Sequence, residues 1–454
     1  MNGDNIPLLP VFFQDKHVGN LLFKSISECE FTYTESWVKD KVAFPISPHI
    51  PFDVKADSQT IVNFIRNLFP EGESFDTLLY NLNVRKNNLY AVLKEIGKDT
   101  PGALTFGKLI IKNDSLREIT EEELAQKLDS DSVQELIVWD GKYRLSVAGV
   151  QRKLNLLVKE EKLFLAEGNY SSTHILKFSK PDQSHLIINE LICMRLARTS
   201  KIDVPDVLFR KFGRHSSLLV TRFDRKLDGD GVLKRHVIDG CQALNRAPEY
   251  KYEQSFGSGN DVKHIRNGIS LNELFGFSDM TRVPIKIKDT LIDWVLFNLI
   301  IGNSDAHGKN ISFLVSNKGI ILSPFYDLVS ISYEAKLADK VDSGLAMAIG
   351  DNFDVDRITA YDLLCFSESI DFPLSKIGKR LSKMLDNVNN AINTEGFYLN
   401  ANDDVMSDDV IYHAGQIIKT IEERVVYFRN EVPEFLPVIK SLFSDKPVAK
   451  SRQL

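Results

Sequence analysis

Cysteine is scarce in this chain. The four cysteines, Cys29, Cys193, Cys241 and Cys365, form no C-x-x-C pair. Zinc sites and the disulfide frameworks of small secreted domains require such closely spaced cysteines. The sequence therefore argues against both, and we expect four buried thiols.

Long hydrophobic runs and a one-sided charge are also missing. The longest apolar stretch, from Trp294 to Ile301, is interrupted by Asn298 and is too short to span a bilayer. The N-terminus has no basic segment followed by an apolar core, which argues against a signal peptide. The formal net charge of -6 gives no overall attraction to nucleic acid. We expect a cytoplasmic protein that does not associate with membranes.

What is present is the composition of an ordinary folded protein. Hydrophobic residues make up 43% and charged residues 26% of the 454 positions. A chain of this length exceeds one common hydrophobic core, so we expect two main lobes and an accessory region. Residues 11–33 alternate as strands do, with a turn expected at Lys16, His17 and Gly19. Helical spacing is found in residues 58–69, with Ser58 as the expected N-cap, and in residues 410–428.

The most informative segment is N-S-D-A-H-G-K-N, from Asn303 to Asn310. It follows an almost unbroken apolar helix and precedes the strand-like run I-S-F-L-V. In protein kinases a catalytic Asp, four intervening residues and a metal-binding Asn share one short loop. Asp305 and Asn310 have this spacing. A second carboxylate, Asp327 in L-S-P-F-Y-D, stands where a kinase keeps its principal metal ligand.

Each of these residues has a simpler explanation when taken alone. Asp305 could form a loop turn, and Asn310 could cap a helix. A metallohydrolase that uses Asp305, His307 and Asp327 is another alternative. The ordered set of Asp305, Asn310 and Asp327 favours phosphoryl transfer. In that interpretation Lys309 is a charge-stabilising donor toward the transferred phosphoryl, and His307 orients the loop or contacts phosphate.

An upstream segment has features of a phosphate cover. In S-V-A-G-V-Q-R-K, from Ser146 to Lys153, the small residues Ala148 and Gly149 let backbone N–H groups approach phosphate oxygens. The segment is neither a Walker loop nor G-x-G-x-x-G. A small turn between strands can equally be a plain hairpin.

Lys177 and Glu190 follow in the order that a kinase uses. Lys177 stands in the strand-like H-I-L-K-F, and Glu190 opens the next helical stretch. A kinase pairs such a Lys with the α- and β-phosphates, and the Glu holds it in register. The alternative is a Lys at a strand edge and a Glu in the first turn of a helix.

Together these motifs resemble a known family. In order along the chain stand F-I-R-N-L-F-P-E-G, E-I-G-K-D-T-P-G-A-L, S-V-A-G-V-Q-R-K, H-I-L-K-F, N-E-L-I-C-M-R-L-A, V-T-R-F-D-R, G-N-S-D-A-H-G-K-N-I-S and P-F-Y-D. Over almost its whole length the chain resembles the HipA serine/threonine kinases, toxin components of bacterial toxin–antitoxin pairs. The resemblance implies an α+β, two-lobed protein-kinase-like fold, with a β-rich N-terminal lobe and a mostly α-helical C-terminal lobe. We expect residues 1–135 to form an accessory subdomain, 136–225 the ATP-binding part of the small lobe, and 226–454 the catalytic lobe.

The resemblance also implies roles for single residues. Asp305 would be the catalytic base, Asn310 and Asp327 would bind Mg²⁺, and Lys177 would contact the ATP phosphates. The expected ATP-binding residues are Ala148, Gly149, Val150, Gln151, Arg152, Lys153, Lys177, Thr221, Arg222, Phe223, Asp224, His307, Gly308, Lys309, Asn310, Tyr326 and Asp327.

The hinge V-T-R-F-D would bind adenine through the backbone of Thr221 and Phe223, with Asp224 near the ribose. Thr221 replaces a Glu associated with this position, which should matter little because the backbone makes the contact. Ser146 matches a serine that is autophosphorylated in the family. Its added negative charge beside the ATP phosphates would eject the loop and switch the kinase off.

Family members act on aminoacyl-tRNA synthetases, notably the glutamyl enzyme, and pair with a small helix-turn-helix antitoxin that binds operator DNA. In this chain the stretch F-S-E-S-I-D-F, from Phe366 to Phe372, is acidic where basic residues would be expected. We therefore expect DNA contact mainly through the antitoxin. Two rival functions remain open: a small-molecule or lipid kinase, and a nucleotide-binding regulatory subunit that acts with an antitoxin.

Overall fold

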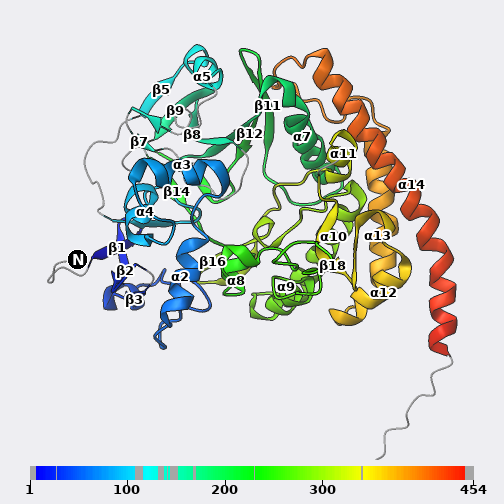
Figure 1. The fold of residues 1–454 in the computed structure, drawn as a ribbon, viewed down its shortest axis with the longest axis horizontal. Helices are drawn as coiled ribbons and strands as arrows, with labels where there is room; N and C mark the ends of the chain where they lie inside the picture. Colours follow the sequence, from blue (N-terminus) through cyan, green and yellow to red (C-terminus); the bar gives the residue numbers. More distant parts are fainter. Residues whose placement is uncertain are drawn as a thin grey trace, which may run out of the picture.

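Figure 1 shows the fold of the chain in a computed structural model. The structure describes residues 7–26, 28–107, 116–130, 138–140, 142–143, 152–166, 170–229, 231–338 and 341–444, with backbone only for 142–143 and 431–444. Five of the expected site residues lie outside these ranges, namely Ser146, Ala148, Gly149, Val150 and Gln151. Their roles stay predictions.

The N-terminal part is a four-stranded antiparallel sheet covered by helices. Its strands have the order β3-β2-β1-β4 and comprise β1 (Leu8–Phe13), β2 (Lys16–Phe23), β3 (Cys29–Tyr33) and β4 (Leu104–Phe106). The helices are α1 (Glu35–Val38), α2 (Ser58–Arg66), α3 (Gly72–Leu82) and α4 (Leu89–Ile96). The loop between α2 and α3 contacts the candidate active site that is described below.

Two local expectations for this part need correction. The turn between β1 and β2 is made by Gln14, in the left-handed region with φ of 54°, and Asp15, so Lys16, His17 and Gly19 already belong to β2. The N-cap of α2 is Asp57, whose carboxylate accepts from the Thr60 N–H. A carboxylate caps as well as a hydroxyl and also suits the positive end of the helix dipole.

The small lobe is built on a six-stranded sheet with the order β11-β12-β10-β8-β9-β5. The strands are β5 (Leu116–Ile119), β8 (Lys153–Lys159), β9 (Lys162–Ala166), β10 (His174–Phe178), β11 (Val207–Phe212) and β12 (His215–Thr221). Side chains alternate between its two faces: Leu218 joins the core that contains α7 (Ser184–Thr199), whereas Leu219 packs in the core that contains Leu124 of α5 (Glu121–Leu128). Because β5 lies in this sheet, the expected division at residue 135 cuts through it.

Shorter strands and 3₁₀ turns lie between the larger elements of both lobes. They are β6 (Val138–Trp139), β7 (Lys142–Tyr143), β13 (Arg225–Asp228), β14 (Gly231–Lys234), β15 (His236–Asp239), β16 (Ser312–Ser316), β17 (Gly319–Leu322), β18 (Gly344–Ile349) and β19 (Asn352–Asp354), with η1 (Pro181–Gln183), η2 (Pro248–Tyr250), η3 (Ser278–Met280), η4 (Gly308–Asn310) and η5 (Val355–Arg357). The hairpin β16–β17 pairs with β15 and carries the chain away from the catalytic loop.

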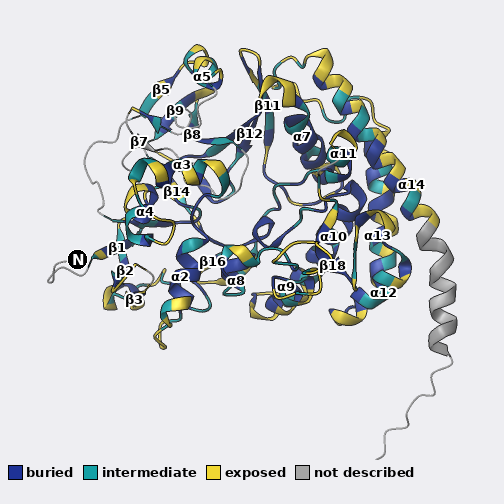
Figure 2. Cartoon of the chain, in the orientation of Figure 1, coloured by how far each residue is buried: buried dark blue, intermediate teal, exposed yellow. Residues whose placement is uncertain are grey.

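The C-terminal lobe is mostly helical. Its helices are α8 (Gly240–Ala243), α9 (Leu271–Phe277), α10 (Pro284–Ile301), α11 (Ile331–Leu337), α12 (Ala360–Ser369), α13 (Leu374–Ile392) and α14 (Asp408–Ser444). Figure 2 shows α10 as a mostly buried helix and the upper part of α14 as a helix with an exposed outer face. Among the described residues every helix is too short or too polar to cross a bilayer. The fold is α+β and two-lobed, as expected.

Candidate active site

The loop from Asn303 to Asn310 is held by the buried helix α10. Eleven of its 18 residues are buried, and it ends at Gly302 in the left-handed conformation, with φ of 69°. A Cβ at Gly302 would lie 2.3 Å from the Ser332 hydroxyl, so only glycine fits this C-cap. The amide of Asn303 then bonds the Asn298 side chain at 2.7 Å. The start of the loop is therefore fixed to the helix that precedes it.

The loop also bonds to itself. The Asn303 side-chain oxygen accepts from the Asp305 N–H at 3.2 Å, and the Asp305 carbonyl accepts from the Asn310 amide at 3.2 Å. This last bond uses the Nδ2 of Asn310 and leaves its Oδ1 without a hydrogen bond from the described residues. Asp305 and Asn310, predicted as a pair from their spacing, thus lie together on one ordered loop.

Asp305 is mostly buried and bonds a tyrosine. Its Oδ1 accepts from the Tyr252 hydroxyl at 2.7 Å. Burial raises the pKa of the Asp305 carboxyl, which the Tyr252 bond and the Lys251 charge only partly oppose. A carboxylate with a raised pKa is a better proton acceptor.

Lys177 lies between two carboxylates from different elements. Its Nζ is 2.7 Å from Oε1 of Glu190 on α7, and it also bonds Oδ1 of Asp327. Burial disfavours the Lys177 ammonium, but Asp327 and Glu190 outweigh it and raise its pKa. The expected pairing of Lys177 with Glu190 is confirmed, and Asp327 joins it although 150 positions separate it from Lys177.

Asp327 has an unusual backbone. Its φ is 55°, the left-handed region that a non-glycine residue seldom adopts. Such strain persists only where the surroundings enforce it and is common at functional sites. The charges of Lys177 and Lys153 lower the pKa of Asp327 against the effect of its burial, so it is a carboxylate at neutral pH.

The donor set of Asn310 and Asp327 fits a hard divalent cation. It offers an amide oxygen and a carboxylate oxygen, and Mg²⁺ prefers oxygen ligands of this kind. Mg²⁺ keeps several waters and takes the remaining ligands from substrate phosphates, so one or two protein ligands are sufficient.

A second lysine faces the same place. Lys153 of β8 is directly opposite Lys177 of β10 in the antiparallel register, so both side chains leave the same face of the sheet. Burial lowers the pKa of Lys153 to about 8, and the Lys177 charge contributes to this shift. Two neighbouring ammonium groups on one face favour an anionic ligand such as a polyphosphate.

Two hinge residues, Thr221 and Phe223, differ in whether their backbone N–H is already bonded within the protein. Phe223 stacks on Tyr326, with the ring centroids 5.8 Å apart and the planes 27° apart. The Thr221 N–H donates to the Asp206 carbonyl at 2.9 Å, so this amide is already occupied. Among the described residues the Phe223 N–H has no hydrogen-bond acceptor, so the expected adenine contact of this N–H stays a prediction.

Asp224 is held by two arginines and by the N-terminal part of the chain. Its Oδ2 accepts from Arg222 at 2.9 Å, from Arg225 at 2.6 Å and from the Gly102 N–H at 3.0 Å, and its Oδ1 accepts from Arg222 at 3.0 Å. Asp224 is 5% exposed, and Arg222 and Arg225 lower its pKa strongly against the effect of burial. Two arginines and the N-terminal part of the chain use both oxygens, which argues against the expected ribose contact. Arg222 is likewise held inside this cluster.

Lys309 is also turned away from the predicted phosphoryl position. Its Nζ is 2.8 Å from Asp239 and bonds both the carbonyl and the side-chain oxygen of Asn67, at 2.9 and 3.0 Å. These contacts fix the catalytic loop to the end of α2, and they correct the expected donor role of Lys309. A buried ammonium needs a counter-charge, and Asp239 supplies it.

His307 and Gly308 support the loop. Burial lowers the pKa of His307 to about 3, so the ring is neutral, and its Nδ1 accepts from the Lys309 N–H at 3.3 Å. Of its two expected roles, the structure supports that of orienting the loop. A Cβ at Gly308 would lie 2.6 Å from Cδ1 of the buried Ile269, which would have to shift to admit a larger residue.

Sequence reasoning missed four residues at this site: Glu71, Asp239, Lys251 and Tyr252. Each reaches the catalytic loop from a segment far away in the chain. Glu71 lies in the quoted segment F-I-R-N-L-F-P-E-G but was given no role there, and the other three belong to none of the quoted motifs. Only the mixture of charged and aromatic residues in E-Y-K-Y-E, residues 249–253, could have drawn attention to two of them.

Comparison with known proteins agrees with this geometry. Family profiles for the HipA-like C-terminal domain and the HipA N-terminal domain match residues 145–394 and 9–107. The serine/threonine-protein kinase toxin HipA of Shewanella oneidensis is 39% identical over 430 residues, covering 93% of this chain and 97% of that protein. A solved complex of HipA, HipB and operator DNA from Shewanella oneidensis MR-1 contains a chain with 37% identity and a TM-score of 0.84, covering 94% of this chain and 98% of that chain. On the ordered kinase-like site and these matches, the chain belongs to the HipA family of serine/threonine-protein kinase toxins.

Proposed function

We propose that this kinase transfers the γ-phosphoryl group of ATP to a serine or threonine of a protein, in the presence of Mg²⁺. The observation that carries the proposal is the position of Lys177, bonded to both Glu190 and Asp327. A kinase needs this arrangement to hold the phosphates beside its metal ligand.

Each part of ATP has a matching group in this arrangement. Adenine fits at the hinge beside the stacked rings of Phe223 and Tyr326, with the Phe223 N–H as donor. The phosphates fit near Lys177 and Lys153, which leave the same face of the sheet. Mg²⁺ at Asn310 and Asp327 would neutralise charge on the phosphates.

The proposed reaction uses Asp305 as the proton acceptor. The oxygen of the substrate hydroxyl bonds the γ-phosphorus, and the bond from that phosphorus to the β–γ bridging oxygen breaks, so that ADP leaves. The hydroxyl proton passes to the Asp305 carboxylate. Burial raises the pKa of Asp305 and suits it to this transfer.

The target and partners that we propose follow from the family resemblance. The target is a translation component such as an aminoacyl-tRNA synthetase, and the partner is a small helix-turn-helix antitoxin. The solved relative in complex with HipB and operator DNA supports an antitoxin and a DNA partner. We propose that DNA is reached mainly through the antitoxin, because α12 and the residues that follow it carry Glu368 and Asp371 on an exposed surface.

We further propose that phosphorylation of Ser146 limits the activity. A phosphate there would add about -2 charge beside the ATP phosphates, and the repulsion would displace the segment. Ser146 lies outside the described residues, so the proposal rests on the resemblance and on this charge argument.

The test is the incubation of the purified protein with Mg-ATP, followed by intact mass measurement and phosphopeptide mapping, beside the Asp305→Asn variant. We expect phosphate on Ser146 in the wild-type protein and none in Asp305→Asn. Asp228→Asn, an exposed aspartate in the β13–β14 hairpin, is the matched control and should behave as wild type. Transfer by Asp305→Asn would contradict the role of Asp305. ATP binding without transfer to self or to bacterial lysate would favour the regulatory-subunit alternative, and labelled metabolites would favour a small-molecule kinase.

A further inference from the structure

Tyr252 contacts the proposed base directly. Its hydroxyl donates to Oδ1 of Asp305 at 2.7 Å, and its ring stands edge-on to His307, with the centroids 5.0 Å apart and the planes 86° apart. Among the described residues, no hydrogen bond reaches the other carboxylate oxygen, Oδ2. The two oxygens of Asp305 are therefore unequal before any substrate binds.

Of the residues on either side of Tyr252, Lys251 bonds the catalytic loop directly and Glu253 bonds it through Ala346. The carbonyl of Lys251 accepts from the Gly308 N–H at 2.9 Å. On the other side, the Glu253 N–H donates to the Ala346 carbonyl at 2.9 Å, and the Ala346 N–H donates to the Ser304 carbonyl at 2.7 Å. Tyr252 is thus held by its own hydroxyl at Asp305, by the direct bond of Lys251 to the loop and by the connection of Glu253 through Ala346.

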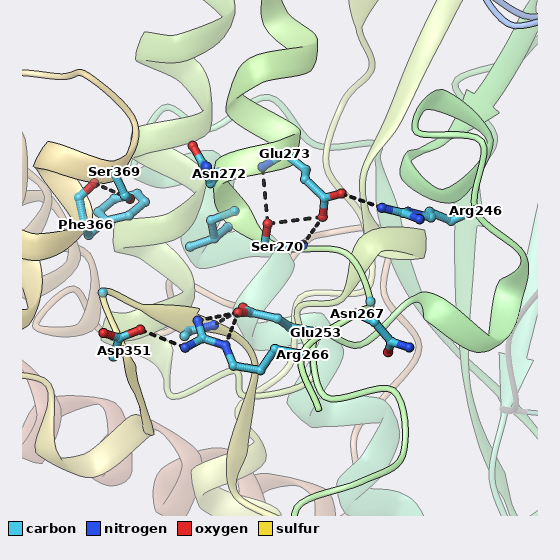
Figure 3. A pocket seen from close by; sticks show the side chains of 14 residues that line it. Arg246, Glu253, Arg266, Asn267, Ser270, Asn272, Glu273, Asp351, Phe366 and Ser369 are labelled. Atoms are coloured by element: carbon cyan, nitrogen blue, oxygen red, sulfur yellow. Dashed lines mark hydrogen bonds and ion pairs between the residues drawn. The ribbon is translucent and has the colours of Figure 1, made fainter. Parts of the chain in front are cut away.

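The segment that contains Tyr252 borders a polar cavity of about 420 Å³ (Figure 3). Glu253 lies in its wall and is 4% exposed. The Arg266 guanidinium donates to Oε1 of Glu253 at 2.7 Å, and the Ala348 N–H donates to Oε2 of Glu253 at 2.8 Å. Gly268, also in the wall, packs so closely on the Tyr252 carbonyl that a Cβ there would lie 1.7 Å from it. The backbone of Tyr252 has little room to move.

We propose that Tyr252 is a positioning residue for phosphoryl transfer: it holds Oδ1 of Asp305 and thereby assigns Oδ2 to the hydroxyl of the serine or threonine that is phosphorylated. This inference rests on the proposed role of Asp305. A hydrogen bond to one oxygen restricts the rotation of the carboxylate and so favours one direction of its second oxygen for the incoming hydroxyl. Burial and the Asp305 charge raise the pKa of Tyr252, so its hydroxyl remains a donor at neutral pH.

Tyr252→Phe removes the hydroxyl and keeps the ring against His307. The experiment measures the initial rate of radiolabel incorporation from ATP into protein of a gel-filtered bacterial lysate, with the Asp305→Asn rate subtracted. We expect the rate at saturating ATP to fall about 10-fold or more, because small misplacements of a catalytic group cost up to about 100-fold. The KM for ATP and the thermal midpoint should stay at their wild-type values, since Tyr252 is expected to contact neither ATP nor the core.

Tyr80→Phe is the matched control, because Tyr80 is 85% exposed and lies on α3. An unchanged maximal rate in Tyr252→Phe would overturn the inference, and so would a loss that appears only in the KM for ATP or with a lower thermal midpoint. If Asp305→Asn is inactive while Tyr252→Phe equals wild type, the inference alone fails. If the wild-type protein labels nothing, or if Asp305→Asn labels as well as wild type, the proposed function fails and this inference with it.

Discussion

Lys177 and Glu190 form an ion pair of 2.7 Å between β10 and α7, in which the side chains are only 9% and 3% exposed. A buried pair is costly to desolvate, and breaking it leaves an uncompensated charge inside the protein. Here Lys177 also bonds Asp327, so one ammonium group links the small lobe to the segment that follows the catalytic loop. The bonds to Glu190 and Asp327 therefore position the Lys177 side chain more than they stabilise the fold.

Lys177→Met should abolish phosphoryl transfer, with a loss of about 100-fold or more, because the phosphates lose their cation. Glu190 and Asp327 would then lose the ammonium that bonds them both and keep only the weaker attraction of Lys153, and we expect a destabilisation of about 3 kcal/mol. Phosphorylation rates and chemical denaturation measure the two effects. Lys226→Met, at an exposed position in β13, should change neither. Full activity of Lys177→Met would refute the assignment of this lysine.

Asp327→Asn should fold and fail to transfer phosphate. Asn tolerates the left-handed backbone that Asp327 adopts, with φ of 55°, so the cost in stability should be small. The loss of the negative charge should weaken Mg²⁺ binding. Titration of Mg²⁺ in the presence of a fluorescent ATP analogue measures this effect. Asp371→Asn is the matched control, because Asp371 is also left-handed, with φ of 50°, and is exposed. Equal Mg²⁺ affinity in the two variants would contradict the ligand role.

Asp224→Asn should lower stability and leave ATP affinity unchanged. The substitution removes one of the two carboxylates that neutralise the buried Arg222 and Arg225 and leaves only Asp99. Removing one partner of a buried ion pair costs about 3–5 kcal/mol. Calorimetric ATP binding at a temperature where the variant is folded separates the two quantities. A variant that is stable and binds ATP weakly would restore the ribose contact expected from the sequence.

Acidification should destabilise the protein through buried, neutral histidines. His236 is 2% exposed, its Nε2 bonds the Ile46 carbonyl at 2.7 Å, and burial lowers its pKa from 6.5 to about 4. Between these values the unfolded chain binds a proton that the folded chain does not, so the free energy of unfolding falls as the pH falls from 6.5 to 4. His236 alone accounts for about 3 kcal/mol of this loss.

Urea denaturation across this range measures the effect, and His236→Gln should flatten the curve because glutamine keeps an N–H donor and binds no proton. His264→Gln, at an exposed position, should leave the slope as in wild type. An unchanged slope in His236→Gln would show that other groups cause the fall in the free energy of unfolding between pH 6.5 and 4. His174 and His307 have pKa values lowered in the same direction, so the slope should not vanish entirely.

The sequence by itself determined the order and chemistry of the site. The spacing of Asp305 and Asn310 was enough to predict that they lie together. Both are on one short loop, and local bonds such as that from Asn310 Nδ2 to the Asp305 carbonyl hold them in place. Lys177 and Glu190 could be paired for a similar reason: a strand and the helix that follows it are neighbours in the chain and in space. The two-lobed α+β fold followed from the same motifs.

Only the tertiary structure decided what the other charged residues contact. Lys309 was expected near the phosphoryl group, yet its ammonium bonds Asn67, 242 positions away. Asp224 was expected at the ribose, yet it neutralises two arginines beside Gly102. A buried charge pairs with a group that the packing of distant segments brings near it. No local periodicity in the sequence predicts which group that is. The bond between Tyr252 and Asp305 arose in the same way, from two segments that meet only when the chain folds.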